Sequence, residues 1–384
     1  MKYKFSSFYL AISIIITTLI GCESVHTEGL KQSIKQPQSD RTMENYILGA
    51  DVSSLPELED YGVKFIDVDG KEKSLLSLLK DHGFNYIRLR TFVEPNNPYG
   101  YASSDSCQGK IESYNDKEHV IKFAKRIKAH GFKLLLDFHY SDTWADPNKQ
   151  VIPQSWRGIS TIDAMSEQVH AYTEDVLTEL KLAGVEPDMV QVGNEITPGM
   201  LIHVPTEKTD CYGNHSTINS ELNGSVSNIE NLGKLLQAGI SAVEQVLPES
   251  PIMLHLENTE HPAGIRSWIN NIYAQGVSFD VLGLSAYEQW QGPSSEWQAT
   301  LTGLAATYPE LSFSIVEYNP QRTLVNEIML NLPNQQGLGT FFWEPALSGE
   351  WGQSMFNVEG LTYKAKQSAF EEYDKLIKDN GLAQ

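Results

Sequence analysis

From residue 46 onward, short apolar runs alternate with longer segments in which apolar side chains recur at helical spacing. The runs are six to eight residues long, as expected of strands buried on both faces, and the segments between them repeat at i, i+3 and i+7, as in amphipathic helices. The expected strands are 46–51, 85–92, 132–138, 188–193, 251–256, 279–285, 311–317 and 337–343. The expected helices are 74–82, 116–130, 162–183, 229–246, 263–275, 294–308, 325–332 and 363–378.

Eight strands that alternate with helices imply parallel pairing through right-handed crossovers. We therefore predict an α/β fold, a single-domain (β/α)8 TIM barrel, over residues 46–384. An open, doubly wound sheet is the alternative. It is disfavoured because no glycine-rich phosphate-binding turn follows the first expected strand. No linker, repeat or low-complexity block interrupts these residues.

The first 21 residues have the pattern of a signal peptide, with Lys2 and Lys4 before an apolar core of about a dozen residues. The core ends in Leu-Ile-Gly-Cys, which resembles a bacterial lipobox. We expect cleavage before Cys22 and a lipid on its thiol; an ordinary signal peptide is the alternative. Residues 22–45 are polar and aperiodic, which predicts a flexible tether. The expected location is the bacterial cell envelope, lipid-anchored and facing the periplasm or the surface.

Charge and cysteine content narrow the class of protein. The 29 Lys and Arg residues against 49 Asp and Glu residues give a net charge of −20. Nucleic acids and other polyanions are therefore disfavoured as partners, because their binding sites are basic. Three cysteines cannot form a disulfide framework. Cys107 and Cys211 both fall in expected loops, and the sequence leaves open whether they form a disulfide.

Polar or aromatic side chains stand at or just after the end of every expected strand. In a (β/α)8 barrel the functional residues cluster at the carboxyl ends of the strands, so these side chains should meet in the barrel mouth. They are Asp51, Arg88, Arg90, His139, Asp142, Asn194, Glu195, His255, Glu257, Tyr287, Glu317 and Trp343.

Two of these residues, Glu195 just after the fourth strand and Glu317 at the end of the seventh, should approach each other from opposite sides of the mouth. Such a pair suits glycoside hydrolysis. One carboxylic acid protonates the leaving oxygen, and the other attacks the anomeric carbon when the two are ~5.5 Å apart. The alternative is that each glutamate only pairs with a barrel arginine, Arg88 or Arg90. The two roles are compatible, because an arginine beside the nucleophile favours its ionised form.

The neighbouring residues allow a functional and a structural interpretation. Asn194 could bond the C2 hydroxyl of a sugar or cap a loop. Trp144, Trp290 and Trp343 could stack against sugar rings or belong to the core, and Tyr287 could bond the nucleophile or pack at the rim. His139, Asp142, His255 and Glu257 match no metal-binding signature, and no G-x-S-x-G motif occurs. We therefore expect neither a metal ion nor a cofactor.

Eight segments occur in an order that resembles glycoside hydrolase family 53, the endo-β-1,4-galactanases, over about residues 47–346. They are GADVSSLPELEDYG, NYIRLRTF, LLLDFHYSDTWADPNKQ, QVGNEITPGML, IMLHLEN, DVLGLSAYEQW, IVEYNP and TFFWEP. The resemblance implies a retaining (β/α)8 enzyme that cuts β-1,4-linked galactan side chains of pectic arabinogalactan. It further implies that Glu195 is the acid/base and Glu317 the nucleophile. The supporting residues implied by the resemblance are Arg88, His139, Asn194, Tyr287 and Trp343. Asp142, Trp144 and His255 are further expected substrate-binding or supporting residues, because of their places in the mouth.

The sequence departs from the family pattern at a few positions. Ile202-His203 stands where Trp-Pro is usual, and Glu257 stands where aspartate is usual. Ala286 and Glu288 flank Tyr287 in place of an aromatic residue and a proline. These positions lie on expected subsite walls, so they bear on product length and subsite number. The alternatives are another member of the clan acting on mannan, xylan or arabinan, and a non-catalytic carbohydrate-binding lipoprotein. We expect no calcium site, because the connection before the eighth strand is short.

Overall fold

The computed structural model describes residues 45–102, 113–206, 216–219, 222–349 and 352–382. The expected signal peptide, the tether up to residue 44, and Cys22, Cys107 and Cys211 lie outside these ranges. Within the described ranges, no helix has both the length and the apolar composition needed to cross a bilayer.

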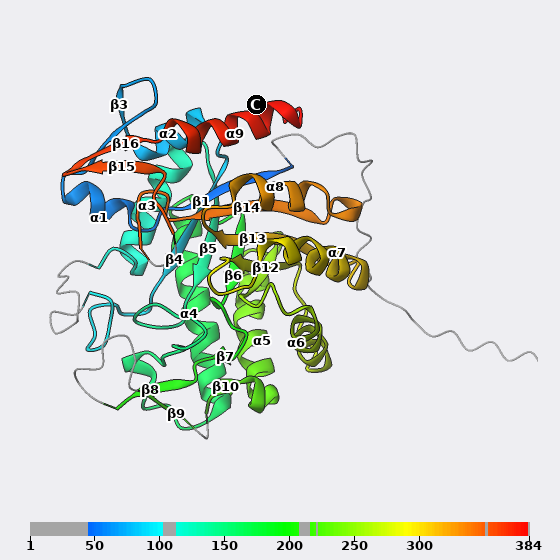
Figure 1. The fold of residues 1–384 in the computed structure, drawn as a ribbon. Coiled ribbons are helices and arrows are strands. Elements are labelled where there is room, and N and C mark those ends of the chain that lie inside the picture. Colours follow the sequence, from blue (N-terminus) through cyan, green and yellow to red (C-terminus); the bar gives the residue numbers. More distant parts are fainter. Residues whose placement is uncertain (1–44, 103–112, 207–215, 220–221, 350–351, 383–384) are drawn as a thin grey trace, which may run out of the picture. The chain divides into compact units, whose positions relative to one another are not determined.

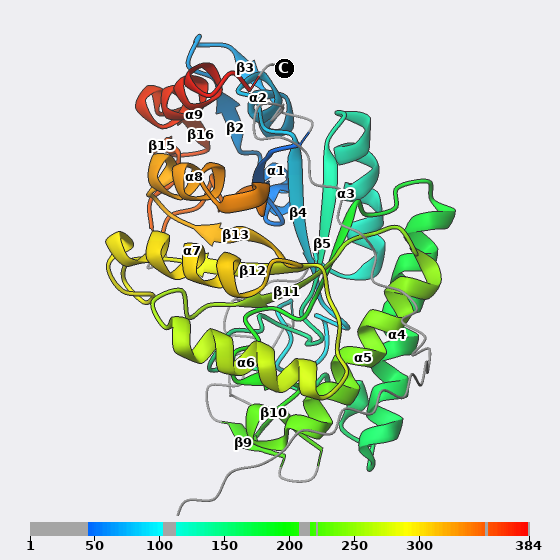
Figure 2. The ribbon, with the colours of Figure 1, turned by 90° about the vertical axis from the view of Figure 1, so that its right-hand side faces the viewer.

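Eight parallel strands close into a barrel, which confirms the predicted fold class (Figures 1 and 2). Each strand pairs with the next along the chain, and the last pairs with the first to complete the ring. All eight predicted strands are confirmed to within two residues at either end. The barrel strands are β1 (Ile47–Asp51), β4 (Tyr86–Thr91), β5 (Lys133–Phe138), β6 (Met189–Val192), β11 (Ile252–Leu256), β12 (Val281–Ala286), β13 (Ser312–Tyr318) and β14 (Gly337–Trp343).

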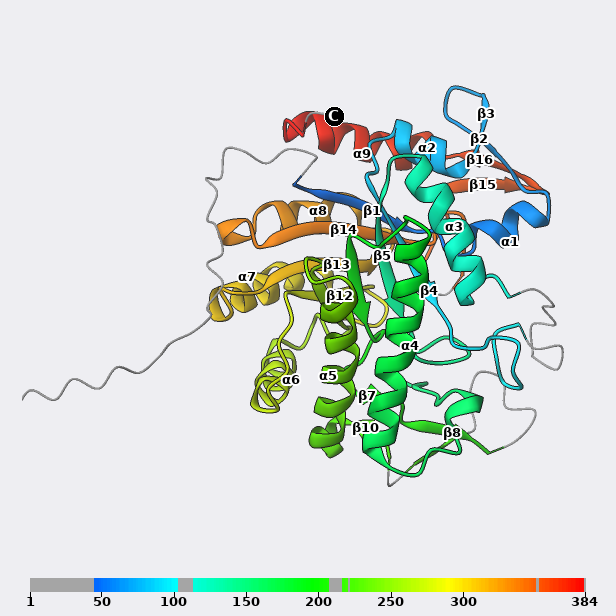
Figure 3. The same cartoon turned by 180° about the vertical axis from the view of Figure 1, so that it is seen from behind.

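Helices surround the barrel, and α4 and α5 run side by side on its outer face (Figures 1 and 3). Capping side chains explain where two of the helices begin. Asp116 accepts the backbone N–H of His119 and caps α3, and Thr161 accepts that of Ala164 and caps α4. The helices are α1 (Leu55–Asp60), α2 (Leu75–Asp81), α3 (Lys117–Ala129), α4 (Ile162–Leu182), α5 (Ile229–Val246), α6 (Pro262–Ala274), α7 (Trp297–Thr307), α8 (Arg322–Leu330) and α9 (Gln367–Asp379).

The prediction for the C-terminal segment is wrong at its start. Residues 363–365, which we expected to begin a helix, belong to β16 (Thr362–Ala365), and α9 begins only at Gln367. This strand pairs with β15 (Phe356–Glu359) and with β2 (Lys64–Ile66), which also pairs with β3 (Glu72–Lys73). The ring of Phe65 packs at 5.3 Å from that of Phe356 and at 5.7 Å from that of Tyr363. The strand therefore depends on contacts with the N-terminal part of the chain, which local periodicity does not reveal.

Two antiparallel sheets of two strands each lie in the connection between β6 and α5. They pair β7 (Gly199–Met200) with β10 (Gly224–Ser225), and β8 (His203–Pro205) with β9 (Ser216–Ile218). Single 3-10 turns cover Gln154–Trp156, Val226–Asn228, Ser294–Glu296 and Pro333–Gln335.

Inside the barrel, side chains change from apolar to polar along several of the strands. The apolar layer consists of Ile47, Tyr86, Leu135, Met189, Met253, Val281, Val316 and Phe341. Gly49 leaves room for this layer, because a Cβ at that position would lie 2.3 Å from the ring of Phe341. Two residues further along several strands, the inward positions are polar, since side chains on one face of a strand recur every second residue. The apolar layer therefore closes the barrel beneath a polar mouth.

Candidate active site

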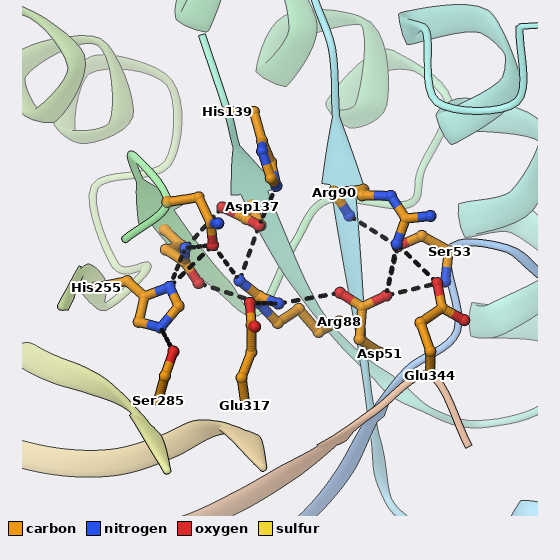
Figure 4. A network of polar contacts seen from close by, with 12 residues as sticks. Asp51, Ser53, Arg88, Arg90, Asp137, His139, His255, Ser285, Glu317 and Glu344 are labelled. Carbon is orange, nitrogen blue, oxygen red and sulfur yellow. Dashed lines mark hydrogen bonds and ion pairs between the residues drawn. The ribbon is translucent and has the colours of Figure 1, made fainter. Parts of the chain in front are cut away.

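The buried guanidinium of Arg88 lies at the centre of the barrel mouth (Figure 4). Its five N–H groups are all used, so this one side chain fixes groups from β1, β5, β6, β13 and the loop after β6. Nε donates to Gln191 Oε1 (3.1 Å), Nη1 donates to Asp51 Oδ2 (3.1 Å) and Glu317 Oε1 (2.9 Å), and Nη2 donates to Asp137 Oδ2 (2.9 Å) and Asn194 Oδ1 (2.7 Å).

Glu317 lies near the end of β13, with its two oxygens held by different partners. Oε1 accepts from Arg88, and Oε2 accepts the hydroxyl of Tyr287 at 3.2 Å. Burial raises the pKa of Glu317 to about 7; Arg88 opposes this rise, whereas the negative charges of Asp51 and Asp137 add to it. A register shift after Leu284 pairs Ser285 of β12 with Glu317, a local irregularity of the kind that often re-aims side chains at active sites.

Glu195 follows β6 in a left-handed backbone conformation, with φ +48°. This region is uncommon for residues other than glycine and is often found at functional sites. Its Oε1 lies 2.6 Å from the hydroxyl oxygen of Ser285. Burial and the charge of Glu317 raise the pKa of Glu195 well above its ordinary value. Of the two carboxyl groups, Glu195 is therefore the one that keeps its proton, while Glu317 ionises first.

The amide of Asn194 connects the arginine to the loop after β5. Oδ1 accepts from Arg88, and Nδ2 donates to the carbonyl of Ala145 at 2.8 Å. The same loop is held by His139, whose Nδ1 accepts the backbone N–H of Ala145 at 2.8 Å. Nε2 of His139 therefore carries its proton, and it faces Asp137 at 3.0 Å. The two residues hold the loop against the mouth.

Two tryptophans form an aromatic wall beside this network. The ring of Trp144 lies 3.9 Å from the guanidinium of Arg90 and 6.0 Å from the ring of Trp343. A third, Trp290, is 46% exposed and contacts the ring of Tyr287 edge-on at 5.3 Å. All three expected tryptophans thus lie near the polar mouth.

Asp142 has a different setting from the other predicted site residues. Its Oδ1 accepts the backbone N–H of Glu94 at 2.9 Å, and its Oδ2 accepts that of Gln154 at 2.7 Å. Burial raises its pKa to about 6. Because both oxygens are occupied by backbone donors, Asp142 orders the rim loops. In the described part of the chain, no three or more His, Cys, Asp or Glu residues are grouped as metal ligands would be.

Several members of this network are absent from the residues predicted from the sequence. Asp137, Gln191 and Ser285 lie on expected strands, and Glu344 follows the last one. Counting every second residue on the inner face would have found the first three: Asp137 follows Leu135 by two, and Gln191 follows Met189 by two. The two-residue period of the strands therefore indicates these inward polar positions, whereas the polar residues that follow the apolar runs do not include them.

Comparison with known proteins identifies the family. A sequence model described as glycosyl hydrolase family 53 matches residues 47–327. The chain belongs to glycosyl hydrolase family 53. It is similar to an endo-β-1,4-galactanase of Bacillus subtilis (31% identity; 79% of this chain and 70% of that one). It is also similar to an arabinogalactan endo-β-1,4-galactanase of Thermothelomyces thermophilus (29% identity; 78% and 89%).

Solved structures of this family have the same fold. A family 53 catalytic domain from Ignisphaera aggregans superposes with a TM-score of 0.72 at 26% identity, covering 90% of this chain and 99% of that one. A fungal β-1,4-galactanase superposes with a TM-score of 0.69 at 27% identity, covering 86% and 98%. The predicted family resemblance is confirmed.

Proposed function

We propose that the protein is a retaining endo-β-1,4-galactanase that cleaves galactan side chains of pectic arabinogalactan. The observation that carries this proposal is the pair of neighbouring carboxyl groups in a family 53 barrel, one of which holds its proton more firmly than the other. Two-carboxyl glycosidases need this difference, because one group acts as an acid while the other acts as an anion.

In the proposed reaction Glu317 attacks the anomeric carbon, and Glu195 gives its proton to the leaving oxygen. Arg88 and Tyr287 hold the two oxygens of Glu317 and so fix its direction of attack. Forming the glycosyl ester removes the negative charge of Glu317, which had been raising the pKa of Glu195. Glu195 then ionises more readily and takes a proton from the water that hydrolyses the ester.

The surrounding residues have proposed roles in binding. Nδ2 of Asn194 donates one N–H to the carbonyl of Ala145. Its second N–H has no acceptor among the described residues, so it can donate to the C2 hydroxyl of the sugar. Trp144, Trp290 and Trp343 offer apolar faces to the galactose rings, while His139 and His255 position the polar groups around them.

The test is to incubate the purified protein with galactan, arabinan, xylan and mannan and to measure new reducing ends. We expect cleavage of galactan alone, with a ladder of oligosaccharides early in the reaction. Cleavage of another glycan would support the alternative clan member, and no cleavage would support a binding protein. In ¹H NMR spectra of fresh digests the β-anomer should form first; initial α-anomer would contradict retention.

We further propose that a lipid on Cys22 anchors the protein to the cell envelope. The Leu-Ile-Gly-Cys sequence and the polar residues that follow it support this proposal. One acyl chain binds membranes only marginally, so firm anchoring requires several chains. Wild type should fractionate with membranes, and Cys22→Ala should not; wild type in the soluble fraction would contradict the anchor.

A further inference from the structure

Ser285 lies between the proposed acid and a buried histidine. Its hydroxyl oxygen is 2.6 Å from Oε1 of Glu195 and 2.9 Å from Nε2 of His255. A serine hydroxyl has one proton, so it donates to one of these two partners and accepts from the other. Two arrangements are therefore open: Ser285 donates to a Glu195 carboxylate, or it accepts from a Glu195 carboxylic acid. The state of His255 decides between them.

His255 is neutral and carries a single N–H. It is fully buried, and burial together with the nearby charge of Arg88 holds its pKa well below the ordinary value. Its Nδ1 lies 2.9 Å from Oδ1 of Asn194. The Asn194 amide cannot be turned around, because its oxygen accepts from Arg88 and its nitrogen donates to a carbonyl. The short contact therefore requires the N–H of His255 to be on Nδ1.

The other neighbours of Nδ1 do not alter this assignment. The side-chain nitrogen of Gln191 is 3.3 Å away, but it has closer acceptors in Asp137 at 2.7 Å and the carbonyl of Gly193 at 3.0 Å. The backbone nitrogen of Glu195 is 3.4 Å away, which is a weak contact. With the proton on Nδ1, Nε2 of His255 is an acceptor, and the Ser285 hydroxyl donates to it.

We propose that Ser285 and His255 are positioning residues that hold the proton on Glu195: Glu195 donates to Ser285, Ser285 to His255, and His255 to Asn194. This inference rests on the proposed role of Glu195 as the acid. No proton moves along this series of hydrogen bonds. Once Glu195 has given its proton to the leaving oxygen, the hydroxyl of Ser285 faces two acceptors with one proton, so the ionised state lacks a hydrogen bond. Negative charge from Glu317 on β13, Glu257 after β11 and Asp146 after β5 disfavours ionisation further.

The two arrangements predict opposite shifts in the pH dependence of kcat/KM for galactan. If Ser285 accepts from the acid, Ser285→Ala destabilises the protonated form, and the alkaline limb moves to lower pH by about 0.5 to 1 unit. Ser285→Thr keeps the hydroxyl and should restore the limb. Ser314→Ala is the matched control, because Ser314 is buried on the neighbouring strand and its hydroxyl, among the described residues, bonds only the carbonyl of Gly339. A limb that stays in place or moves to higher pH in Ser285→Ala overturns the proposal.

A second measurement needs no substrate. In the full chain labelled with ¹⁵N-histidine, His255 is recognised as a ring that stays neutral at acidic pH. We expect the spectrum of the Nδ1–H tautomer below the alkaline limb; the Nε2–H tautomer would overturn the proposal. Because the spectrum is independent of cleavage, an Nδ1–H signal in a protein that does not cut galactan would refute the proposed function and leave the hydrogen-bond series standing.

Discussion

Two arginine–glutamate pairs lie next to each other in the barrel mouth, Arg88 with Glu317 and Arg90 with Glu344 (Figure 4). The N–O distances are 2.9 Å and 2.7 Å, and both arginines are fully buried. Both also contact Asp51, at 3.1 Å and 3.5 Å. Burial raises the pKa of each glutamate to about 7. Neither the ion pair nor the raised pKa therefore marks Glu317 as the reactive group.

The difference between the pairs lies in what faces each glutamate. Oε1 of Glu344 accepts three hydrogen bonds, from Arg90 and from the backbone N–H and hydroxyl of Ser54. Glu317 divides its contacts between Arg88 and Tyr287, and the charge of Glu317 acts on a second carboxyl group, Glu195. A buried glutamate next to an arginine thus has only structural partners in one pair, whereas in the other it has a carboxyl neighbour, on which the proposed chemical role of Glu317 depends.

The largest expected effect separates the two glutamates directly. Glu317→Gln should reduce kcat to background on both galactan and an aryl galactoside, because the nucleophile is gone. Glu344→Gln should keep kcat within about tenfold, but lower the free energy of unfolding by about 3 kcal/mol, because it leaves Arg90 buried with one weaker carboxylate partner. Kinetics and urea unfolding measure both effects. If Glu344→Gln abolished turnover without loss of stability, the assignment of a structural role to Glu344 would be wrong.

The next prediction tests Glu195, the carboxyl group beside Glu317. Glu195→Gln should lower kcat on galactan by about 10²- to 10⁴-fold, because the leaving sugar oxygen needs a proton. An aryl galactoside with an acidic phenol needs little protonation, so its glycosylation rate, measured as the burst of phenol, should change far less. Equal losses on both substrates would show that Glu195 is not the acid.

A smaller effect concerns pH. The proposed mechanism requires Glu317 ionised and Glu195 protonated. The rate should therefore rise through the pKa of Glu317, which burial raises to about 7, and fall through that of Glu195, which is higher. These limbs describe the coupled pair. The optimum should lie at or above neutrality in a kcat/KM profile. Glu344→Gln is the control: a rising limb that moves in this variant would belong to Glu344.

The sequence predicted the barrel and the two glutamates for a physical reason. Each strand is a continuous apolar run that ends in a polar residue, and parallel strands bring those ends together. The pattern of apolar runs alone does not separate Glu317 from Glu344, since Glu317 stands near the end of one apolar strand and Glu344 directly after another, and only their neighbours in space differ. Ser285 was missed because, although the two-residue period places it on the inner face with Val281, a lone hydroxyl indicates no function until its partners Glu195 and His255 are in place. Strand 362–365 was missed because it pairs with residues 64–66, about 300 positions away.

The smallest expected effect concerns the tryptophan beside each pair. Trp144 covers the guanidinium of Arg90, whereas the exposed Trp290 touches Tyr287, which holds Glu317. Trp290→Ala should raise KM for galactan about two- to tenfold, the value of one stacking contact, with kcat and Tm unchanged. Trp144→Ala should raise KM and also lower Tm, because it removes the cation–π contact and opens Arg90 to water. Trp290→Phe keeps an aromatic face and should recover most of the affinity. A fall in kcat at constant KM in Trp290→Ala would instead mean that Trp290 acts through Tyr287 on the nucleophile.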